Sequence, residues 1–204
     1  MSNRRCFGVL MALFVVLFAV LAVSPREPAT WAMENAVAVL FVIGLWATRR
    51  WFRFSRSAYL MMFSFLALHE IGAHYTYSHV PYDQTLHTLF GFSPDAVMGW
   101  QRNQYDRFLH LLYGLLLVLP LSELCREWGG LRRPAAALFA FTLILASSLL
   151  YELIEWGAAV ALGDGSTAFL GTQGDPWDAQ KDMALATVGA LASLVIAALA
   201  RRIR

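Results

Sequence analysis

The chain has 204 residues, of which 58% are hydrophobic and only 15% charged, and its formal net charge is +2. A soluble globular domain is about 45–50% apolar and about 25% charged, so this composition, with a mean hydropathy of +0.53, indicates a membrane protein. The small net charge and the lack of a basic stripe exclude a nucleic-acid-binding protein, and the length allows one bundle without a separate soluble domain.

Six hydrophobic stretches are long enough to cross the hydrocarbon core of a bilayer, which takes roughly 20 mostly apolar residues. In chain order, we predict transmembrane helices over about 7–23, 31–48, 58–73, 108–124, 134–162 and 183–200. The expected fold is therefore an all-α polytopic membrane protein, with six transmembrane helices in one bundle over residues 1–204.

The first stretch has a second interpretation. Arg4 and Arg5 before an apolar run also describe a secretory signal peptide. The run is long for the core of a signal peptide, and residues 21–25, which follow it, make a poor cleavage site. We therefore favour an uncleaved helix.

Arginine alternates between the two sides of the predicted bundle. The inner segments carry Arg4, Arg5, Arg49, Arg50, Arg53, Arg56, Arg126, Arg132, Arg133, Arg201, Arg202 and Arg204. The outer loops carry Arg26, Arg102 and Arg107. Because cytoplasmic segments of membrane proteins are enriched in Lys and Arg, we expect both termini in the cytoplasm.

Ionisable residues gather where the last four predicted helices approach the outer surface. They occur in H-E-I-G-A-H from residue 69, N-Q-Y-D-R-F-L-H from 103, Y-E-L-I-E-W from 151 and G-T-Q-G-D-P-W-D-A-Q-K-D from 171. Because successive helices run in opposite directions, these four segments share one membrane depth. Charges at such depths are costly and usually face a bundle interior or a cavity, so the shared depth predicts a functional site.

The residue types in these segments are metal ligands. Imidazole nitrogens and carboxylate oxygens bind zinc, manganese or iron, and helical bundles build such sites from facing helices. Asp106 and His110 lie about 40° apart, one turn from each other, on one helix face. H-E-x-x-x-H is one residue longer than the zinc-protease motif, and Glu-x-x-Glu is not the Glu-x-x-His of di-iron bundles, so we exclude both classes.

The charge balance of the segments also favours a cation. The carboxylates are those of Glu70, Asp106, Glu152, Glu155, Asp175, Asp178 and Asp182. Only Arg107 and Lys181 oppose them as permanent cations, and unpaired charges in a low-dielectric surround are expensive. The alternative is a structural polar network, in which Arg107 pairs with a glutamate of the fifth helix and Lys181 with an aspartate.

The motifs resemble those of the YjdF-type family of bacterial inner-membrane proteins. The similar segments are H-E-x-G-A-H-Y-T-Y, N-x-Y-D-R-x-x-H-x-x-Y-G, Y-E-x-x-E-W and G-T-Q-G-D-x-W-D-x-x-x-D-M, which extend roughly from the second to the sixth predicted helix. The resemblance implies a multi-pass protein of the bacterial inner membrane. It implies no activity and no catalytic roles, because the family has no assigned function. The entry to the last helix is also weakly similar to VanZ-like membrane proteins.

From the residues we derive the hypothesis of a metal-dependent hydrolase that acts on a lipid or envelope substrate from the outer face of the membrane. The expected cofactor is a divalent transition metal, zinc, iron or manganese, because imidazole favours these ions over magnesium and calcium. The expected ligands are His69, His74, Asp106, His110, Glu152 and Asp178. Glu155 or Glu70 is expected to act as general base, and Arg107 or Lys181 to stabilise developing negative charge.

Two alternatives stay open beside the hydrolase. A transporter or proton-coupled carrier would use the same carboxylates to bind a cation in transit. The inner halves of the helices are almost purely apolar, with Glu123 as the exception, which weighs against this alternative. A structural or assembly protein would use the polar cluster only to lock the bundle.

Overall fold

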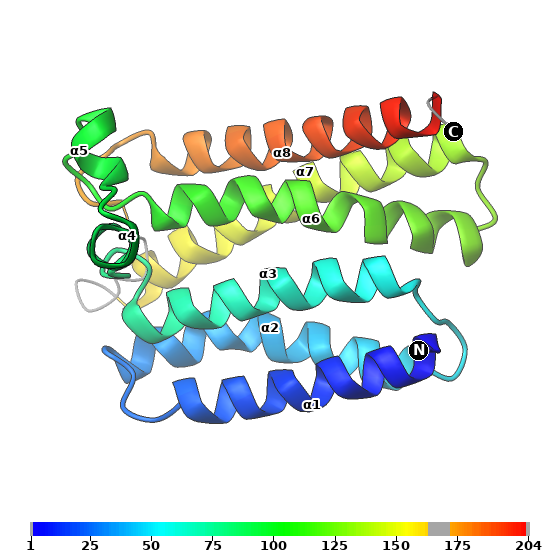
Figure 1. Ribbon diagram of the computed structural model, residues 1–204, viewed down its shortest axis with the longest axis horizontal. Coiled ribbons are helices and arrows are strands. Elements are labelled where there is room, and N and C mark those ends of the chain that lie inside the picture. The colour runs from blue at the N-terminus through cyan, green and yellow to red at the C-terminus, as the bar shows by residue number, and fades with distance from the viewer. Residues whose placement is uncertain (1, 163–171, 203–204) are drawn as a thin grey trace.

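A computed structural model describes residues 2–162 and 172–202 of the chain, and within these ranges it contains helices and loops but no strand (Figure 1). The long helices are α1 (Asn3–Leu21), α2 (Pro28–Thr48), α3 (Arg56–Tyr75), α6 (Tyr105–Glu127), α7 (Arg133–Leu162) and α8 (Asp178–Arg202). Two short helices, α4 (Tyr82–Phe90) and α5 (Pro94–Met98), lie between α3 and α6. Each predicted hydrophobic stretch overlaps one of the long helices. The sequence did not predict α4 and α5, because they are too short to show a clear helical spacing of apolar residues.

The long helices run side by side, and five of them are long and apolar enough to cross a membrane: α1, α2, α6, α7 and α8. Helix α3 has 20 residues but carries His69, Glu70 and His74 in its last two turns, which lower its hydropathy. It packs between α1 and α6, where neighbouring helices cover much of its surface. The structure thus confirms an all-helical membrane protein, while the count of six spans stays a prediction.

Helix α6 and helix α8 pack closely through small residues. A methyl group added at Gly114 of α6 would overlap the carbonyl oxygen of Ala186, and one added at Gly189 of α8 would overlap that of Leu111. Ala186 and Ala190 are completely buried in the same contact. Small residues allow membrane helices to approach backbone to backbone, so this contact sets the first turns of α6 beside the first turns of α8.

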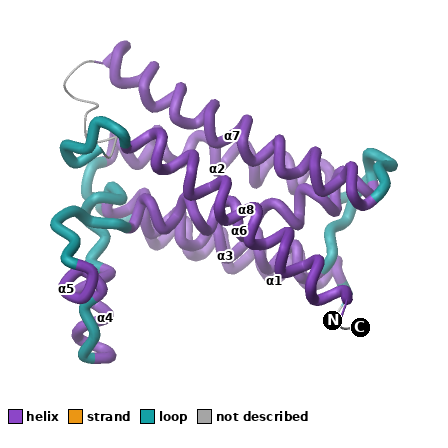
Figure 2. The backbone as a smooth tube through the Cα atoms, turned by 90° about the horizontal axis from the view of Figure 1, so that it is seen from above, coloured by secondary structure: helices purple, strands orange, loops and turns teal. Residues whose placement is uncertain are grey.

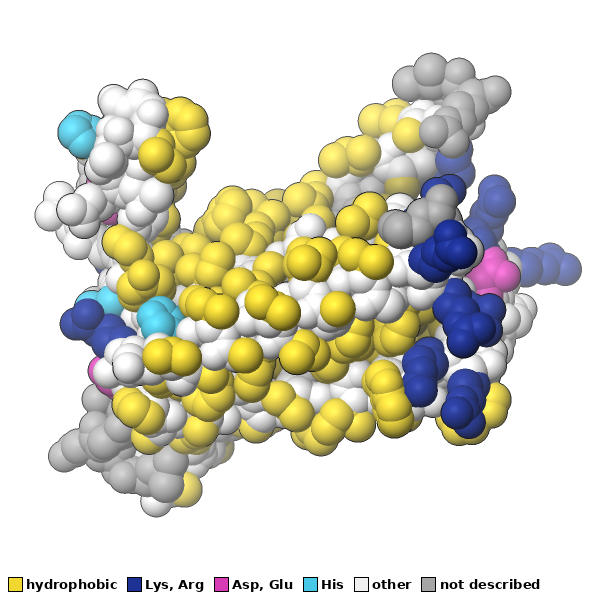
Figure 3. Space-filling model, turned by 60° about the horizontal axis from the view of Figure 1, so that its bottom comes forward, with side chains coloured by type: hydrophobic (Ala, Val, Ile, Leu, Met, Phe, Trp, Pro, Cys, Tyr) yellow, Lys and Arg dark blue, Asp and Glu magenta, His cyan; other side chains and the backbone are white. Residues whose placement is uncertain are grey.

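The opposite ends of the bundle differ in chemistry. The N and C ends of the chain lie at the end where arginine side chains gather, and hydrophobic side chains form a belt between the two ends (Figures 1 and 3). At this arginine-rich end, the Glu123 carboxylate of α6 accepts hydrogen bonds from the N–H and the hydroxyl of Ser55, whose side chain caps α3. At the other end, α4 and α5 form an arm that projects across the bundle axis (Figure 2).

Candidate functional site

A cavity of about 590 Å³ lies between α2, α3, α6 and α7. Its acidic and histidine lining residues, with three further polar ones, gather at the end of the bundle that carries the α4–α5 arm, which we call the polar end of the cavity; the hydroxyls of Thr48, Tyr113, Ser147 and Ser148 line the rest of it. The residues at the polar end are Glu34, His69, Thr76, Tyr77, Asp106, His110, Tyr151 and Glu155. Volumes of about 300–1,000 Å³ with a few converging polar groups are typical of small-molecule sites, so the cavity is the candidate functional site.

Three side chains beside the cavity form a group with the composition of a metal site. One ligand atom each from Asp106, His110 and Asp182 lies within 4.8 Å of the other two. The Nε2 atom of His110 is 3.6 Å from Oδ1 of Asp106, one turn earlier on α6. Tetrahedral zinc ligands with bonds of about 2.1 Å are about 3.4 Å apart, so this pair already has a suitable spacing. Asp182 reaches the pair because α8 packs so closely on α6.

Two buried carboxylate oxygens at this group have no hydrogen-bond partner within the described part of the chain. Asp182 is 3% exposed, and its Oδ1 atom has no hydrogen-bond partner among the residues that the structure describes. The same holds for Oε1 of Glu152 on α7, which lies 3.8 Å from Nε2 of His110. Buried polar atoms are almost always paired, so two unpaired oxygens beside one imidazole favour a cation or water at this position.

Of the two expected general bases, only one lines the cavity. Glu155 faces it from α7, near its polar end, whereas Glu70 is not a lining residue. Glu70 is completely buried in α3, and neither of its carboxylate oxygens has a hydrogen-bond partner within the described part of the chain. Both assignments stay predictions, and the geometry favours Glu155 as the group that can reach a bound molecule.

The two histidines of α3 point to different surroundings. Nδ1 of His69 is 2.5 Å from the hydroxyl of Tyr77, and His69 lines the cavity. The backbone turns sharply at Thr76 and Tyr77, which have φ values of 55° and 36°, and this turn returns the Tyr77 ring to Gly72 and His69. Burial raises the pKa of Tyr77 well above its usual value, so its hydroxyl keeps its proton.

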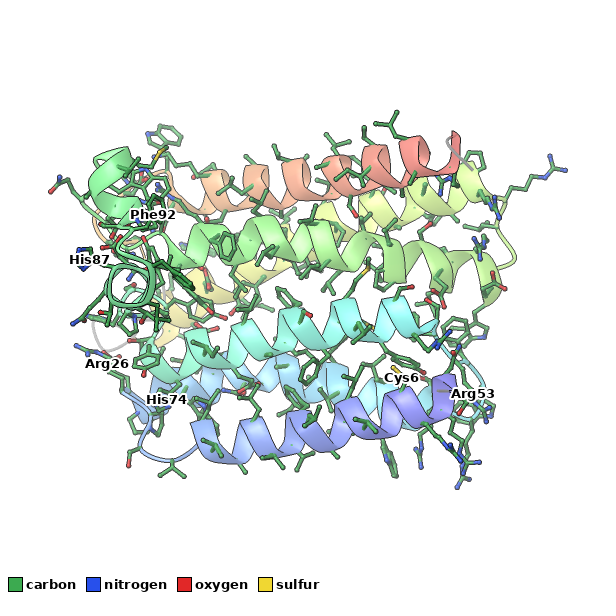
Figure 4. The ribbon with its side chains drawn as sticks, in the orientation of Figure 1. Cys6, Arg26, Arg53, His74, His87 and Phe92 are labelled. Atoms are coloured by element: carbon green, nitrogen blue, oxygen red, sulfur yellow. The ribbon has the colours of Figure 1, made fainter. Side chains whose placement is uncertain are left out.

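His74 lies away from the cavity. Its Nδ1 atom is 2.8 Å from the carbonyl oxygen of Leu21, and its own carbonyl oxygen accepts a hydrogen bond from the N–H of Arg26. Figure 4 shows His74 beside the connection between α1 and α2. These bonds join the end of α3 to that connection and give His74 a structural surrounding.

An ion-pair network connects the start of α6 with the entry to α8. Arg102 and Arg107 both contact the carboxylates of Asp175 and Asp178, and Nζ of Lys181 is 2.5 Å from Asp175. Hydrogen bonds from Lys181, from the N–H of Trp177 and from Arg107 hold the pKa of Asp175 at about 2, below its ordinary value of 3.8. The structure therefore places Asp178, Arg107 and Lys181 together in a network in which their charges are paired with opposite charges.

The sequence reasoning missed one acidic residue of the site. Glu34 of α2 is 3% exposed and lines the cavity, and its carboxylate accepts a hydrogen bond from the Tyr151 hydroxyl of α7. An acidic residue six positions inside an apolar helix is itself a signal of function, because an ionised carboxylate is expensive at that depth. By contrast, no feature of the sequence indicated that the Tyr151 hydroxyl or Arg102 would contact the acidic residues of the site.

Comparison with known proteins agrees with the resemblance of the motifs. The chain is 36% identical to the inner membrane protein YjdF of Escherichia coli (strain K12) over 177 residues. This matched region covers 86% of this chain and 81% of that protein. No solved structure matches the chain. The family model described as "Predicted membrane protein (DUF2238)" matches residues 7–203. The chain is therefore a member of the DUF2238 family of inner-membrane proteins.

Proposed function

We propose that this protein is a metal-dependent hydrolase of the bacterial inner membrane, which acts on a lipid or envelope substrate at the outer leaflet. The observation that carries the proposal is the group of Asp106, His110 and Asp182, whose ligand atoms lie within 4.8 Å of one another beside a cavity between the long helices. A mixed set of imidazole and carboxylate ligands suits zinc, iron or manganese.

The proposal includes a topology with six spans and cytoplasmic termini. Helix α3 would be the sixth span, shielded from lipid by its neighbours. The gathering of arginine side chains at the end with both termini supports a cytoplasmic location for that end (Figure 3). The polar end of the cavity then lies toward the outer leaflet.

The proposed metal site retains three residues of the ligand set expected from the sequence, Asp106, His110 and Glu152, and adds Asp182. It does not use His74 and Asp178, whose side chains contact the α1–α2 connection and the arginines. His69, which lines the cavity, stays a proposed ligand or a group that orients the substrate.

A hydrolytic reaction would divide the roles among these residues as follows. The bound metal would polarise a water molecule and lower its pKa toward about 7. Glu155 would take one proton of this water while the remaining hydroxyl attacks the carbonyl carbon or phosphorus of an ester. The bond to the leaving oxygen breaks, and this oxygen receives the proton from Glu155.

The second candidate is a structural polar network. The ion pairs of Arg102, Arg107 and Lys181 with Asp175 and Asp178 favour it, because they show that part of the outer polar set joins helices to one another. A transporter has less support, since near the inner end Glu123 is hydrogen-bonded to the cap of α3 and Glu127 is paired with Arg126.

Elemental analysis tests the proposal. Detergent-purified protein, reconstituted with zinc, iron or manganese and then desalted, is expected to retain about one equivalent of metal. The variants His110→Ala and Asp182→Asn should lose it, whereas Glu127→Gln, at the opposite end of α6, should retain it. Equal metal content in all four proteins would reject the metal site and leave the structural network.

Metal-dependent release of fatty acid or phosphate from a bacterial lipid extract tests the reaction separately. Wild type and Glu127→Gln should release it, and Asp182→Asn and Glu155→Gln should not. Metal binding without release from the extract would confine the proposal to metal binding.

A further inference from the structure

The cavity has a lining that changes from polar to apolar along one face of α6. Asp106 and His110 line the polar end, and the lining then continues through Tyr113, Leu117 and Leu124. These positions are three to seven residues apart and so return to the same side of the helix. From Asp106 to Leu124 the helix rises about 27 Å at 1.5 Å per residue, close to the hydrocarbon thickness of about 30 Å.

The apolar part of the lining comes from every helix around the cavity. Phe41 and Leu45 of α2, Phe65 of α3 and Leu143 of α7 face the same space as Leu117. The hydroxyls of Tyr113 and Ser147 in this region are hydrogen-bonded to each other. With these two hydroxyls paired to each other, the apolar part of the lining offers few partners to water, which needs several.

One side of the cavity is bounded by two helices that make no extensive contact. Helices α2 and α7 both line the cavity, but among the four helices around it the extensive contacts are those of α3 with α6 and of α6 with α7, and α2 packs mainly on α3. The hydrogen bond from Tyr151 to Glu34 joins α2 and α7 near the polar end. Figures 1 and 2 show these two helices on the same side of the bundle, where lipid would adjoin them.

We propose that the cavity binds the hydrocarbon chain of a membrane amphiphile, which enters between α2 and α7 and places its polar head at Asp106 and His110. This inference rests on the proposed function, because it identifies the hydrolase substrate as such an amphiphile. The apolar lining extends farther than half of the hydrocarbon thickness, or about 15 Å, so it matches one long chain that passes the bilayer midplane. Both a phospholipid acyl chain and a polyisoprenyl chain have this chemistry.

Photocrosslinking in detergent tests the inference with two probes, a phosphatidylglycerol and a polyprenyl phosphate, each with a diazirine at the end of its chain. The probe that binds should label peptides around Leu117 and Leu121, and the stronger of the two probes identifies the source of the chain. Leu121→Trp, which fills the apolar part, should lower labelling about tenfold, equivalent to about 1.4 kcal/mol. The matched control Leu150→Trp changes a residue that is 58% exposed and does not line the cavity, so it should leave labelling unchanged.

The same samples separate this inference from the metal site. Leu121→Trp should keep its metal, because Leu121 is about 16 Å along α6 from His110 at 1.5 Å per residue. Asp182→Asn should lose its metal and still be labelled. Labelling spread evenly over the lipid-facing surface, or unchanged in Leu121→Trp, overturns the chain-binding inference even if metal is bound. Loss of labelling in Leu121→Trp supports the inference if this variant and Leu150→Trp have the same melting temperature. If Leu121→Trp is less stable, Leu143→Trp fills the same cavity from α7 and is tested in its place.

Discussion

The close contact of α6 with α8 predicts how the site responds to a single methyl group. In Gly189→Ala, the new methyl group meets the carbonyl oxygen of Leu111, so the two helices must separate. Overpacking of a tight interior contact costs about 1–3 kcal/mol. For a chain of this size each kcal/mol shifts the melting temperature by about 2–4 °C, so a loss of about 2 kcal/mol should lower it by roughly 4–8 °C.

The separation should also weaken metal binding, because Asp182 is on α8 and its partners Asp106 and His110 are on α6. Thermal unfolding in detergent and metal affinity are measured on the same preparation. Gly8→Ala of α1 is the matched control, since nothing lies within 4 Å of the position of the added methyl group. Alanine has the higher helix propensity, by about 1 kcal/mol, so the control should be as stable as the wild type or more stable. If Gly189→Ala and Gly8→Ala have the same melting temperature and the same metal affinity, the close packing does not set the geometry of the site.

Three further predictions concern topology, the cavity and pH. With both termini inside, an introduced Thr88→Cys on α4 should react with an impermeant maleimide added outside, whereas Cys125 should react only after the membrane is opened; the reverse pattern would invert the topology. Tyr151→Phe removes the hydroxyl that donates a hydrogen bond to the buried carboxylate of Glu34. Because loss of one such bond costs about 1–3 kcal/mol, the melting temperature of the variant should fall. An unchanged melting temperature would show that Glu34 has another donor. The pKa of Asp175 is about 2 in the folded protein, below its ordinary 3.8, so its ion pairs stabilise the fold above about pH 4 and are lost as the pH falls toward 2. The difference in melting temperature between wild type and Asp175→Asn should therefore be constant from about pH 8 to pH 5 and shrink below about pH 4, and a change near neutral pH would contradict this assignment.

Much of the architecture follows from the sequence because the bilayer leaves few choices. Backbone groups in lipid must form their hydrogen bonds within the segment, so long apolar runs become helices. All six predicted stretches correspond to long helices of the structure. The positions of polar residues along these helices also predicted that they share one end of the bundle, and Asp106, His110 and Glu152 do meet at one end.

The neighbours of each side chain could not be obtained in this way, because they depend on helix rotation and on contacts between distant segments. Gly114 and Gly189 are unremarkable in sequence, yet their contact brings Asp182 to His110. The rotation of α3 and the turn after it place His69 in the cavity and His74 at the α1–α2 connection. Depth is a property of one helix and can be read along the chain, whereas the facing partner is a property of two helices and is decided by their packing.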